Sequence, residues 1–376
     1  MPRPVKVCFV GFYAWPLFKP ARTGDIGGAE VQLYTLAREL ARDPGFRVDF
    51  IVRDESGGSE TIDGVTVRKL PLIRRPGTGR QLAYALGLWR LLGTIGPDVV
   101  VQRAAGSLTA LLGIYCAVNR KRFVYMVAHD SDVEPGKPGS FPGNAAWRAY
   151  RIGLRLADTV IVQHDRQRQR LLDNYGKAGI VRPCALEAPG ATPAGERRHI
   201  LWVGRCERIK QPERFISLAQ AFPRESFVMI CPPAASGPAY FESIRNLALN
   251  QRNLTFVERV PFQEIGAHFR AARIFVNTSI QEGFPNTFVQ AWMHGAPVVS
   301  LAVDPGGVMA RHGLGISCEG SQTALETALS SLLADRHLWE RFSRNASAHA
   351  GEHHDIRRQV ERDRRWLTGS GDPCAE

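Results

Sequence analysis

Short apolar runs alternate with helical patterns along almost the whole chain of 376 residues. The runs are rich in β-branched residues, as strands buried on both faces of a parallel sheet usually are. Between the first two, residues 28–42 form a helical pattern in which Val31, Tyr34, Leu36 and Leu40 can face a sheet. In the first half, the expected strands are residues 5–11, 47–52, 98–103, 123–128 and 159–163. This alternation predicts an open α/β domain.

The alternation restarts after residues 183–198, a stretch rich in Pro, Ala and Gly that is the best linker candidate. The strands expected after it are residues 199–204, 226–231, 254–258, 273–277 and 296–301. We therefore expect two doubly wound, Rossmann-like α/β domains that face a cleft, which also fits the chain length. The first would span residues 1–182 and the second residues 190–354, with a last helix in residues 355–376 packing back on the first.

Composition is that of an ordinary soluble protein, with 44% hydrophobic and 22% charged residues. No apolar run reaches the roughly 20 residues that a membrane span needs, and we expect no signal peptide. Seven scattered cysteines without a C-x-x-C pair fit a reducing cytoplasm.

The chain is basic, with 48 Lys and Arg against 36 Asp and Glu, a net charge of +12. Such an excess suits phosphorylated ligands or an anionic membrane, although an Arg-rich proteome explains it equally simply. No nucleic-acid-binding motif is present, so we expect no nucleic-acid partner. Arg148, Arg151 and Arg155 share one helical face that could rest on the anionic inner leaflet, as could residues 74–93. A core-facing helix with a solvated basic edge is the alternative.

A single acid, Glu282, follows the expected strand 273–277 and precedes a Gly-Phe-Pro-Asn turn and a helix. In parallel sheets, ligands bind beyond the carboxyl ends of the strands. Free N–H groups at the helix start, with Pro285 or Asn286 near the cap, suit a phosphate or sugar oxygen. Glu282 can accept hydrogen bonds from sugar hydroxyls, while a plain capped turn is the structural alternative.

Two cations, Arg205 and Lys210, follow the first strand of the second half, where they could neutralise a leaving diphosphate. Because Glu207 lies between them, a solvated charge run is the alternative. In the first half, Gly27 and Gly28 at a helix start permit a ligand to approach the backbone closely. No G-x-G-x-x-G follows the first strand, which counts against a dinucleotide enzyme.

Together these segments resemble the retaining GT-B glycosyltransferases of family 4. The resemblance rests on "GGAE" at a helix start, "VAHD" after a strand, "VGR" with a lysine five residues on, and "S…EGFPN…A…G.PVV". It covers nearly the whole chain in order and spacing, and the last motif is the most specific. "VVVQRAAG" and "FVYMVAHDSDV" also resemble a bacterial branch of the family that builds surface polysaccharides.

The resemblance implies roles for particular residues. Arg205 and Lys210 would hold the donor diphosphate in place of a metal ion, so we expect no metal cofactor. Glu282 would bind donor-sugar hydroxyls, and His129 would lie near the reacting centre, with its carbonyl or ring against that sugar. The further donor-binding residues that the resemblance implies are Gly27, Gly28, Glu30, Gly283, Phe284, Pro285, Asn286, Thr287, Gln290 and Val260.

Gln290 departs from the family pattern, which usually has a second glutamate eight positions after the first. An amide oxygen still accepts a hydrogen bond from a ribose hydroxyl, but without charge. We therefore expect weaker or altered donor binding rather than lost catalysis. Loss of activity is the alternative.

Two other patterns point to metal sites. Asp130 and Asp132 form a D-x-D, the metal-binding signature of the other large glycosyltransferase fold. His349, His353 and His354 have helical spacing that could hold zinc, although a polar helix end is the simpler interpretation.

We expect a cytoplasmic enzyme of the hexosyltransferase type that could also bind peripherally to the inner membrane face. It would move a sugar from a nucleotide-diphosphate sugar to a saccharide or lipid-linked acceptor, with retention, in cell-surface polysaccharide biosynthesis. The alternatives are a non-catalytic nucleotide-sugar-binding partner of an assembly complex and a nucleotide-sugar epimerase of the same architecture.

Overall fold

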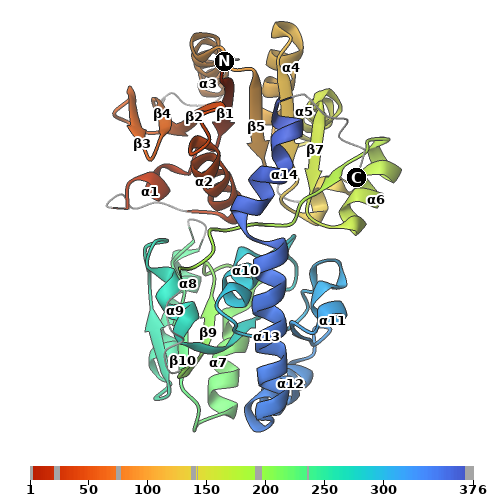
Figure 1. Cartoon of the computed structure of the whole chain (residues 1–376). Coiled ribbons are helices and arrows are strands. Elements are labelled where there is room, and N and C mark those ends of the chain that lie inside the picture. Colours follow the sequence, from red (N-terminus) through yellow and green to blue (C-terminus); the bar gives the residue numbers. More distant parts are fainter. Residues whose placement is uncertain are drawn as a thin grey trace. The chain divides into compact units, whose positions relative to one another are not determined.

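The computed structural model describes residues 3–20, 26–72, 78–136, 141, 143–190, 197–234 and 237–368. The chain forms two compact units, one of residues 1–183 and 356–376, and one of residues 184–355. Each unit contains a sheet flanked by helices (Figure 1). The predicted segments 74–77, 191–196 and 369–376 lie outside the described residues.

The sheet of the first unit has eight strands in the order β3-β4-β2-β1-β5-β6-β7-β8. Its strands are β1 Val5–Val10, β2 Phe46–Arg53, β3 Ser59–Ile62, β4 Val65–Leu70, β5 Val99–Arg103, β6 Arg122–Met126, β7 Thr159–Val162 and β8 Ile180–Val181. All neighbouring strands are parallel except β3 and β4. The five strands predicted for this half are confirmed.

The hairpin of β3 and β4 at the sheet edge was not predicted. It turns at Asp63 and Gly64, whose φ angles of 50° and 80° are those of a two-residue type I′ turn. The Asp-Gly pair is the strongest short-range sequence signal for such a hairpin, so the sequence did carry it.

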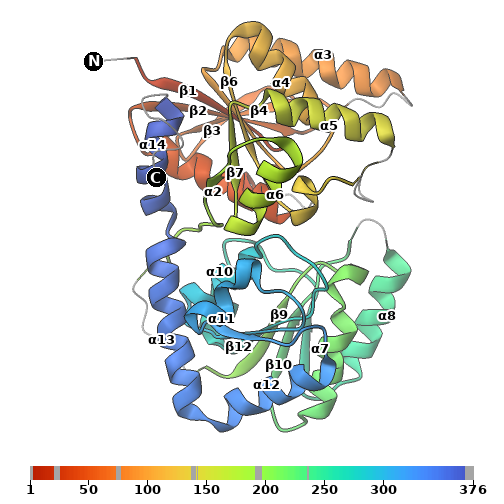
Figure 2. The ribbon, with the colours of Figure 1, turned by 90° about the vertical axis from the view of Figure 1, so that its right-hand side faces the viewer.

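Helices cover both faces of this sheet (Figure 2). The helices are α1 Trp15–Phe18, α2 Gly28–Ala41, α3 Thr78–Ile95, α4 Leu108–Asn119, α5 Asn144–Leu156, α6 Asp165–Tyr175 and α14 Ile356–Thr368, with a 3₁₀ helix η1 at Asp130–Val133. Helices α3 to α6 share one apolar cluster with the sheet. Helix α14 belongs to this unit: Arg182 Nε donates to the buried Asp363 Oδ1 at 2.6 Å, and Arg364 pairs with Asp43 on the α2 side.

The sheet of the second unit has six parallel strands in the order β11-β10-β9-β12-β13-β14. These are β9 His199–Val203, β10 Phe227–Ile230, β11 Leu254–Val257, β12 Ala272–Asn277, β13 Val298–Ser300 and β14 Gly315–Ser317. The five predicted strands are again confirmed, while the three-residue β14 was not predicted. The remaining elements are η2 Arg208–Lys210, α7 Pro212–Ala221, α8 Pro238–Leu249, α9 Ile265–Ala271, α10 Asn286–Met293, η3 Pro305–Gly307, α11 Val308–His312, α12 Gln322–Ala334 and α13 Arg336–His353.

Both sheets reverse their strand order at one point, β1 in the first unit and β9 in the second. In the second unit, β9 lies between β10 and β12, so the connections that leave β9 and β12 run to opposite sides of the sheet. The carboxyl ends of such a strand pair form the usual ligand crevice of a doubly wound sheet. The segments 204–210 and 278–282 both begin there.

Candidate functional site

Lys210 and Glu282 meet at the carboxyl ends of β9 and β12 and form an ion pair. Lys210 is the last residue of η2, and Glu282 lies in the loop between β12 and α10. Ser279 Oγ donates a second hydrogen bond, of 2.8 Å, to the same Glu282 oxygen, Oε1. The two charged side chains keep 22% and 12% of their surface exposed, so a ligand can still reach them.

Buried polar side chains tie the two loops together behind this pair. Thr278 Oγ1 donates to the Lys210 carbonyl at 2.6 Å and accepts from Trp202 Nε1 at 2.9 Å. Asn277 Nδ2 donates to Ser279 Oγ at 3.2 Å. These groups are almost fully buried, and a buried polar network with satisfied partners holds a single arrangement. The network therefore fixes where Lys210 and Glu282 stand.

Trp202, Thr278 and Ser279 were not among the predicted site residues. A signal was available, because Asn277, Thr278 and Ser279 are three consecutive polar residues at the end of an apolar strand. Ser279 also begins the most specific of the quoted motifs.

Arg205 lies on the same loop as Lys210, and its Nη2 pairs with Glu207 Oε1 at 2.9 Å. Its side chain is 40% exposed, and the backbone beside it is held by the Cys206 N–H, which donates to the Pro232 carbonyl at 2.8 Å. Each predicted phosphate-binding cation thus has a carboxylate partner in this structure. A bound diphosphate would either bond to the two cations beside these carboxylates or displace the carboxylates, because phosphate oxygens make strong charge-assisted bonds to Arg and Lys.

The predicted donor turn leads into helix α10. Pro285 is the N-cap residue, Asn286 and Thr287 are the first two helical residues, and no side chain caps this end. Because the first N–H groups of a helix have no acceptor within the helix, Gly283 to Thr287 can present main-chain donors to an anion or a sugar oxygen.

The Phe284 side chain has a structural task instead. Its ring packs against Trp292 and His354, with centroids 6.1 and 5.2 Å away, and its carbonyl accepts from Cys184 Sγ at 3.3 Å. Because the ring is buried, only the main chain of Phe284 remains for a donor.

Gln290 lies one helical turn after Asn286, on the same face of α10. Its carbonyl accepts from His294 Nδ1 at 2.8 Å, while its half-buried side-chain amide has no hydrogen-bond partner in the part of the chain that the structure describes. That amide is therefore available to a ligand. Val260, by contrast, follows the edge strand β11, two strands from β9.

In the first unit, Gly27 is the N-cap of α2 and Gly28 its first residue. A Cβ atom on Gly27 would lie 2.6 Å from Glu30 Oε2, so the acid folds back over this end of the helix. A larger residue at position 27 would therefore require the Glu30 side chain to move. Residues 21–25, just before it, are not described.

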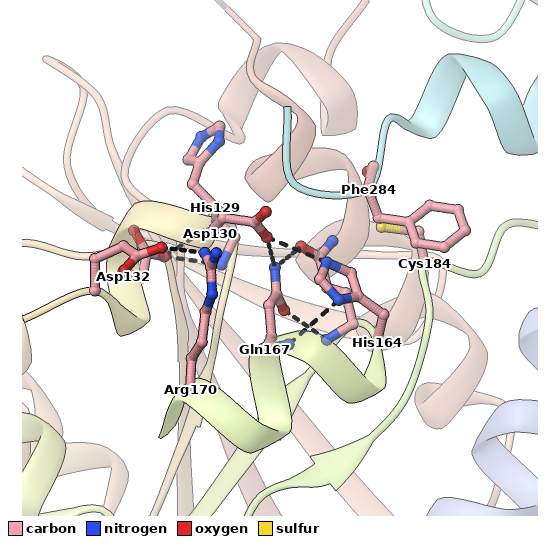
Figure 3. A network of polar contacts seen from close by, with 11 residues as sticks. His129, Asp130, Asp132, His164, Gln167, Arg170, Cys184 and Phe284 are labelled. Carbon is pink, nitrogen blue, oxygen red and sulfur yellow. Dashed lines mark hydrogen bonds and ion pairs between the residues drawn. The ribbon is translucent and has the colours of Figure 1, made fainter. Parts of the chain in front are cut away.

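His129 lies after β6, and the loop that carries it is held by Asp132. The buried Asp132 carboxylate accepts from the Ala128 N–H at 2.9 Å, the His129 N–H at 3.2 Å and the Tyr125 hydroxyl at 3.3 Å. Burial raises the pKa of Asp132. Figure 3 shows the His129 ring directed away from the contacts that Asp130 makes with His164 and Gln167.

The structure does not favour either metal alternative. Asp132 is only 3% exposed and serves the loop, so the D-x-D does not offer two carboxylates to one ion. The histidines form a partly buried cluster rather than a polar helix end, and His354 Nδ1 donates to the Cys184 carbonyl at 2.6 Å. Among the described residues, no group of three or more His, Cys, Asp or Glu side chains is arranged to hold a metal ion.

Two family models match the chain. Residues 27–185 match the glycosyl transferase 4-like domain, and residues 197–335 match the glycosyl transferases group 1. Relatives include D-inositol 3-phosphate glycosyltransferases. That of Kineococcus radiotolerans is 25% identical over 79% of this chain and 78% of its own, and that of Corynebacterium efficiens is 25% identical over 92% and 91%.

Two solved structures share the fold. Sucrose-phosphate synthase of Thermosynechococcus elongatus is 18% identical with a TM-score of 0.77, covering 98% of this chain and all of that one. HepE of Anabaena, solved in complex with UDP and glucose, is 16% identical with a TM-score of 0.73, covering 97% and 100%.

Proposed function

Because the chain belongs to the GT-B glycosyltransferases of the family 4 type, we propose that it moves a hexose from a nucleotide-diphosphate sugar to a hydroxyl of a saccharide or lipid-linked acceptor. The anomeric configuration would be retained. The bond between the sugar and the diphosphate breaks, and the nucleoside diphosphate leaves with the bonding electrons. The acceptor oxygen bonds the sugar, and its proton passes to an oxygen of the leaving diphosphate.

The observation that carries this proposal is the pairing of Lys210 with Glu282 at the point where the strand order of the second sheet reverses. The donor diphosphate would bind Lys210 and Arg205, whose charges oppose the negative charge that grows on the leaving group. Glu282, supported by Ser279, would accept hydrogen bonds from hydroxyls of the donor sugar. The main-chain N–H groups of residues 283–287 would complete the donor site.

For the acceptor and the donor base we propose only which compounds to test first. The names of the relatives contain inositol 3-phosphate and sucrose-phosphate, and the HepE structure holds UDP. A UDP-sugar is therefore the first donor to test, and myo-inositol and its 3-phosphate are the first small acceptors. The role in surface-polysaccharide biosynthesis rests on the motif resemblance alone.

We further propose that the enzyme works at the inner face of an anionic membrane, with helices α3 to α5 toward the lipid. None of the 36 acidic residues lies on these three helices. Four large apolar side chains on α4 and α5 are exposed, each over at least 37% of its surface. They are Ile114, Val118, Ile152 and Leu156. Leu156 of α5 lies against Gly113 of α4, which brings the two exposed stripes together.

The three arginines of α5 were expected to share one exposed face, but only two of them are exposed. Arg148 and Arg155 are exposed beside the apolar stripe, whereas Arg151 lies over the Tyr175 ring, 5.8 Å from its centroid, with a buried Nε. The proposed membrane surface therefore uses Arg148 and Arg155 but not Arg151. Exposed apolar groups together with unbalanced positive charge suit an anionic lipid surface. No helix among the described residues is long and apolar enough to cross a membrane.

The proposed reaction is tested by incubating the purified chain with a panel of UDP- and GDP-sugars and the two small acceptors. Mass spectrometry should detect a glycosylated acceptor, and NMR of its anomeric centre should show the configuration of the donor. A changed donor sugar without an acceptor would instead identify an epimerase. Donor binding in a thermal shift assay, without turnover of any donor, would identify a non-catalytic partner.

A further inference from the structure

Asp130, the first residue of η1, uses its two carboxylate oxygens unequally. Oδ1 accepts from His164 Nε2 at 3.1 Å and from Gln167 Nε2 at 2.8 Å (Figure 3). Oδ2 makes no hydrogen bond with any residue that the structure describes. The side chain is 21% exposed, so this oxygen lies at the surface of the first unit.

Both donors to Oδ1 are fixed by their other contacts. His164 is the N-cap of α6, and its Nδ1 accepts from the Gln167 N–H at 3.3 Å, which leaves the ring proton on Nε2. Gln167 is fully buried, and its Oε1 accepts from the Gln163 N–H at 2.8 Å, which turns its NH₂ group toward Asp130. The carboxylate is therefore held rigidly by two fixed hydrogen-bond donors.

Among the described residues, no lysine or arginine forms an ion pair with Asp130. Burial alone would raise the pKa of Asp130, but the hydrogen bonds from His164 and Gln167 outweigh it and hold the pKa below its usual value. Arg170, the cation that acts on it from α6, forms an ion pair with Glu134. An ionised and partly buried carboxylate without a Lys or Arg ion-pair partner among the described residues is costly, which points to a use beyond holding the loop.

Its place in the fold suggests which ligand it meets. Asp130 directly follows His129 at the carboxyl end of β6, where a doubly wound sheet binds ligands. A fixed anion disfavours a phosphate group but accepts hydrogen bonds from neutral hydroxyls. The two cations proposed to hold the donor diphosphate lie on the other unit.

We propose that Asp130 Oδ2 accepts a hydrogen bond from a hydroxyl of the acceptor and thereby positions that molecule. This inference rests on the proposed glycosyltransferase reaction. It also specifies the acceptor, which presents an unphosphorylated polyol edge to Asp130. The competing explanation is that Asp130 only ties η1 to α6.

Asp130→Asn separates the two explanations, because asparagine keeps an oxygen for His164 and Gln167 but replaces the free oxygen with an NH₂ group. We expect the acceptor KM to rise about tenfold, the loss of one charge-assisted bond, with donor KM and Tm unchanged. The matched control is Asp132→Asn, the same change two residues on. It should lower Tm, because that carboxylate holds two backbone N–H groups of the loop.

Direct binding keeps the test independent of turnover. Isothermal titration of myo-inositol and of methyl α-D-glucoside should show binding to the wild type and about tenfold weaker binding to Asp130→Asn. Equal affinity in both proteins, no binding in either, or an unchanged acceptor KM would overturn the proposal. A rise in donor KM instead would move Asp130 to the donor and overturn it as well. Failure of transfer with every donor, while this binding difference persists, would count against the proposed reaction alone.

Discussion

Lys210 and Glu282, 72 residues apart in the sequence, form an ion pair between the loops that follow the adjacent strands β9 and β12. Each was predicted separately to bind a different part of the donor. Their contact means that the groups proposed to bind the diphosphate and the sugar are already paired with each other, so a donor would have to compete with this ion pair. Thr278 and Trp202 hold this unit from behind.

Substitutions of Gln290 should change donor binding and leave kcat nearly constant, because a ribose contact acts equally in the ground state and the transition state. Gln290→Glu should lower the donor KM by up to about tenfold, and Gln290→Ala should weaken binding by about 1–2 kcal/mol. Glu282→Gln is the contrasting variant and should lower kcat, because the donor sugar changes as its bond breaks. The measurement is steady-state kinetics at varied donor concentration. A lower kcat in the Gln290 variants, with only a higher donor KM in Glu282→Gln, would mean that the two roles are reversed.

Activity should survive EDTA, because Arg205 and Lys210 supply the positive charge that a metal ion would otherwise bring to the diphosphate. The measurement is the initial rate of transfer after dialysis against EDTA, with and without added Mn²⁺. A rate that disappears with EDTA and returns with Mn²⁺ would contradict this assignment of the two cations.

Binding to anionic vesicles should weaken with salt and with charge reversal on α5. Each arginine near such a surface contributes about 1 kcal/mol, so Arg148→Glu with Arg155→Glu should weaken binding at least tenfold in co-sedimentation. Arg224→Glu with Arg252→Glu changes the same charge at exposed positions of the second unit and serves as the control. Equal losses in both double variants would show that net charge, and not this surface, attracts the vesicles.

Stability should fall as the pH drops below about 6.5. Burial lowers the pKa of His354 to about 4 and that of His349 to about 3, so the unfolded chain binds protons that the folded chain excludes. The contribution is fully present above pH 6.5 and declines by up to about 1.4 kcal/mol per pH unit for each histidine as the pH approaches its folded pKa.

Urea unfolding at pH 7 and pH 5 measures this decline. His354→Phe should reduce the difference between the two pH values, although it also removes the bond to the Cys184 carbonyl and so lowers stability at both. His337→Gln, at an exposed position of α13, is the matched control and should leave the difference intact. An identical difference in His354→Phe and wild type would rule out His354 as its source.

The sequence predicts most of this fold because strands buried on both faces read as continuous apolar runs. It fails at the sheet edges for the same reason: β3 carries the partly exposed Glu60 on an alternating pattern, and β14 has only three residues. The positions of Arg205, Lys210 and Glu282 after strands were also readable. Their pairing was not, because it depends on β9 and β12 being neighbours, and strand order is a property of the whole sheet.

The sequence also does not predict which way a side chain points. The D-x-D spacing of Asp130 and Asp132 does not reveal that the 3₁₀ turn buries one carboxylate under the loop and leaves the other at the surface. Nor do the three arginines of α5 show that Arg151 packs over Tyr175, which lies on the next helix.

If the Lys210–Glu282 pair is the donor centre of a glycosyltransferase, kcat for sugar transfer should depend on Lys210, which Lys210→Ala measures. The substitution removes the charge that opposes the leaving diphosphate, so kcat should fall on the order of 10²-fold with Tm little changed. Arg208→Ala is the control, because Arg208 lies on the same loop but over the Tyr240 ring, 4.6 Å from its centroid. A fall in Lys210→Ala but not in Arg208→Ala is the predicted result. Wild-type kcat in Lys210→Ala would show that this pair is not the donor centre.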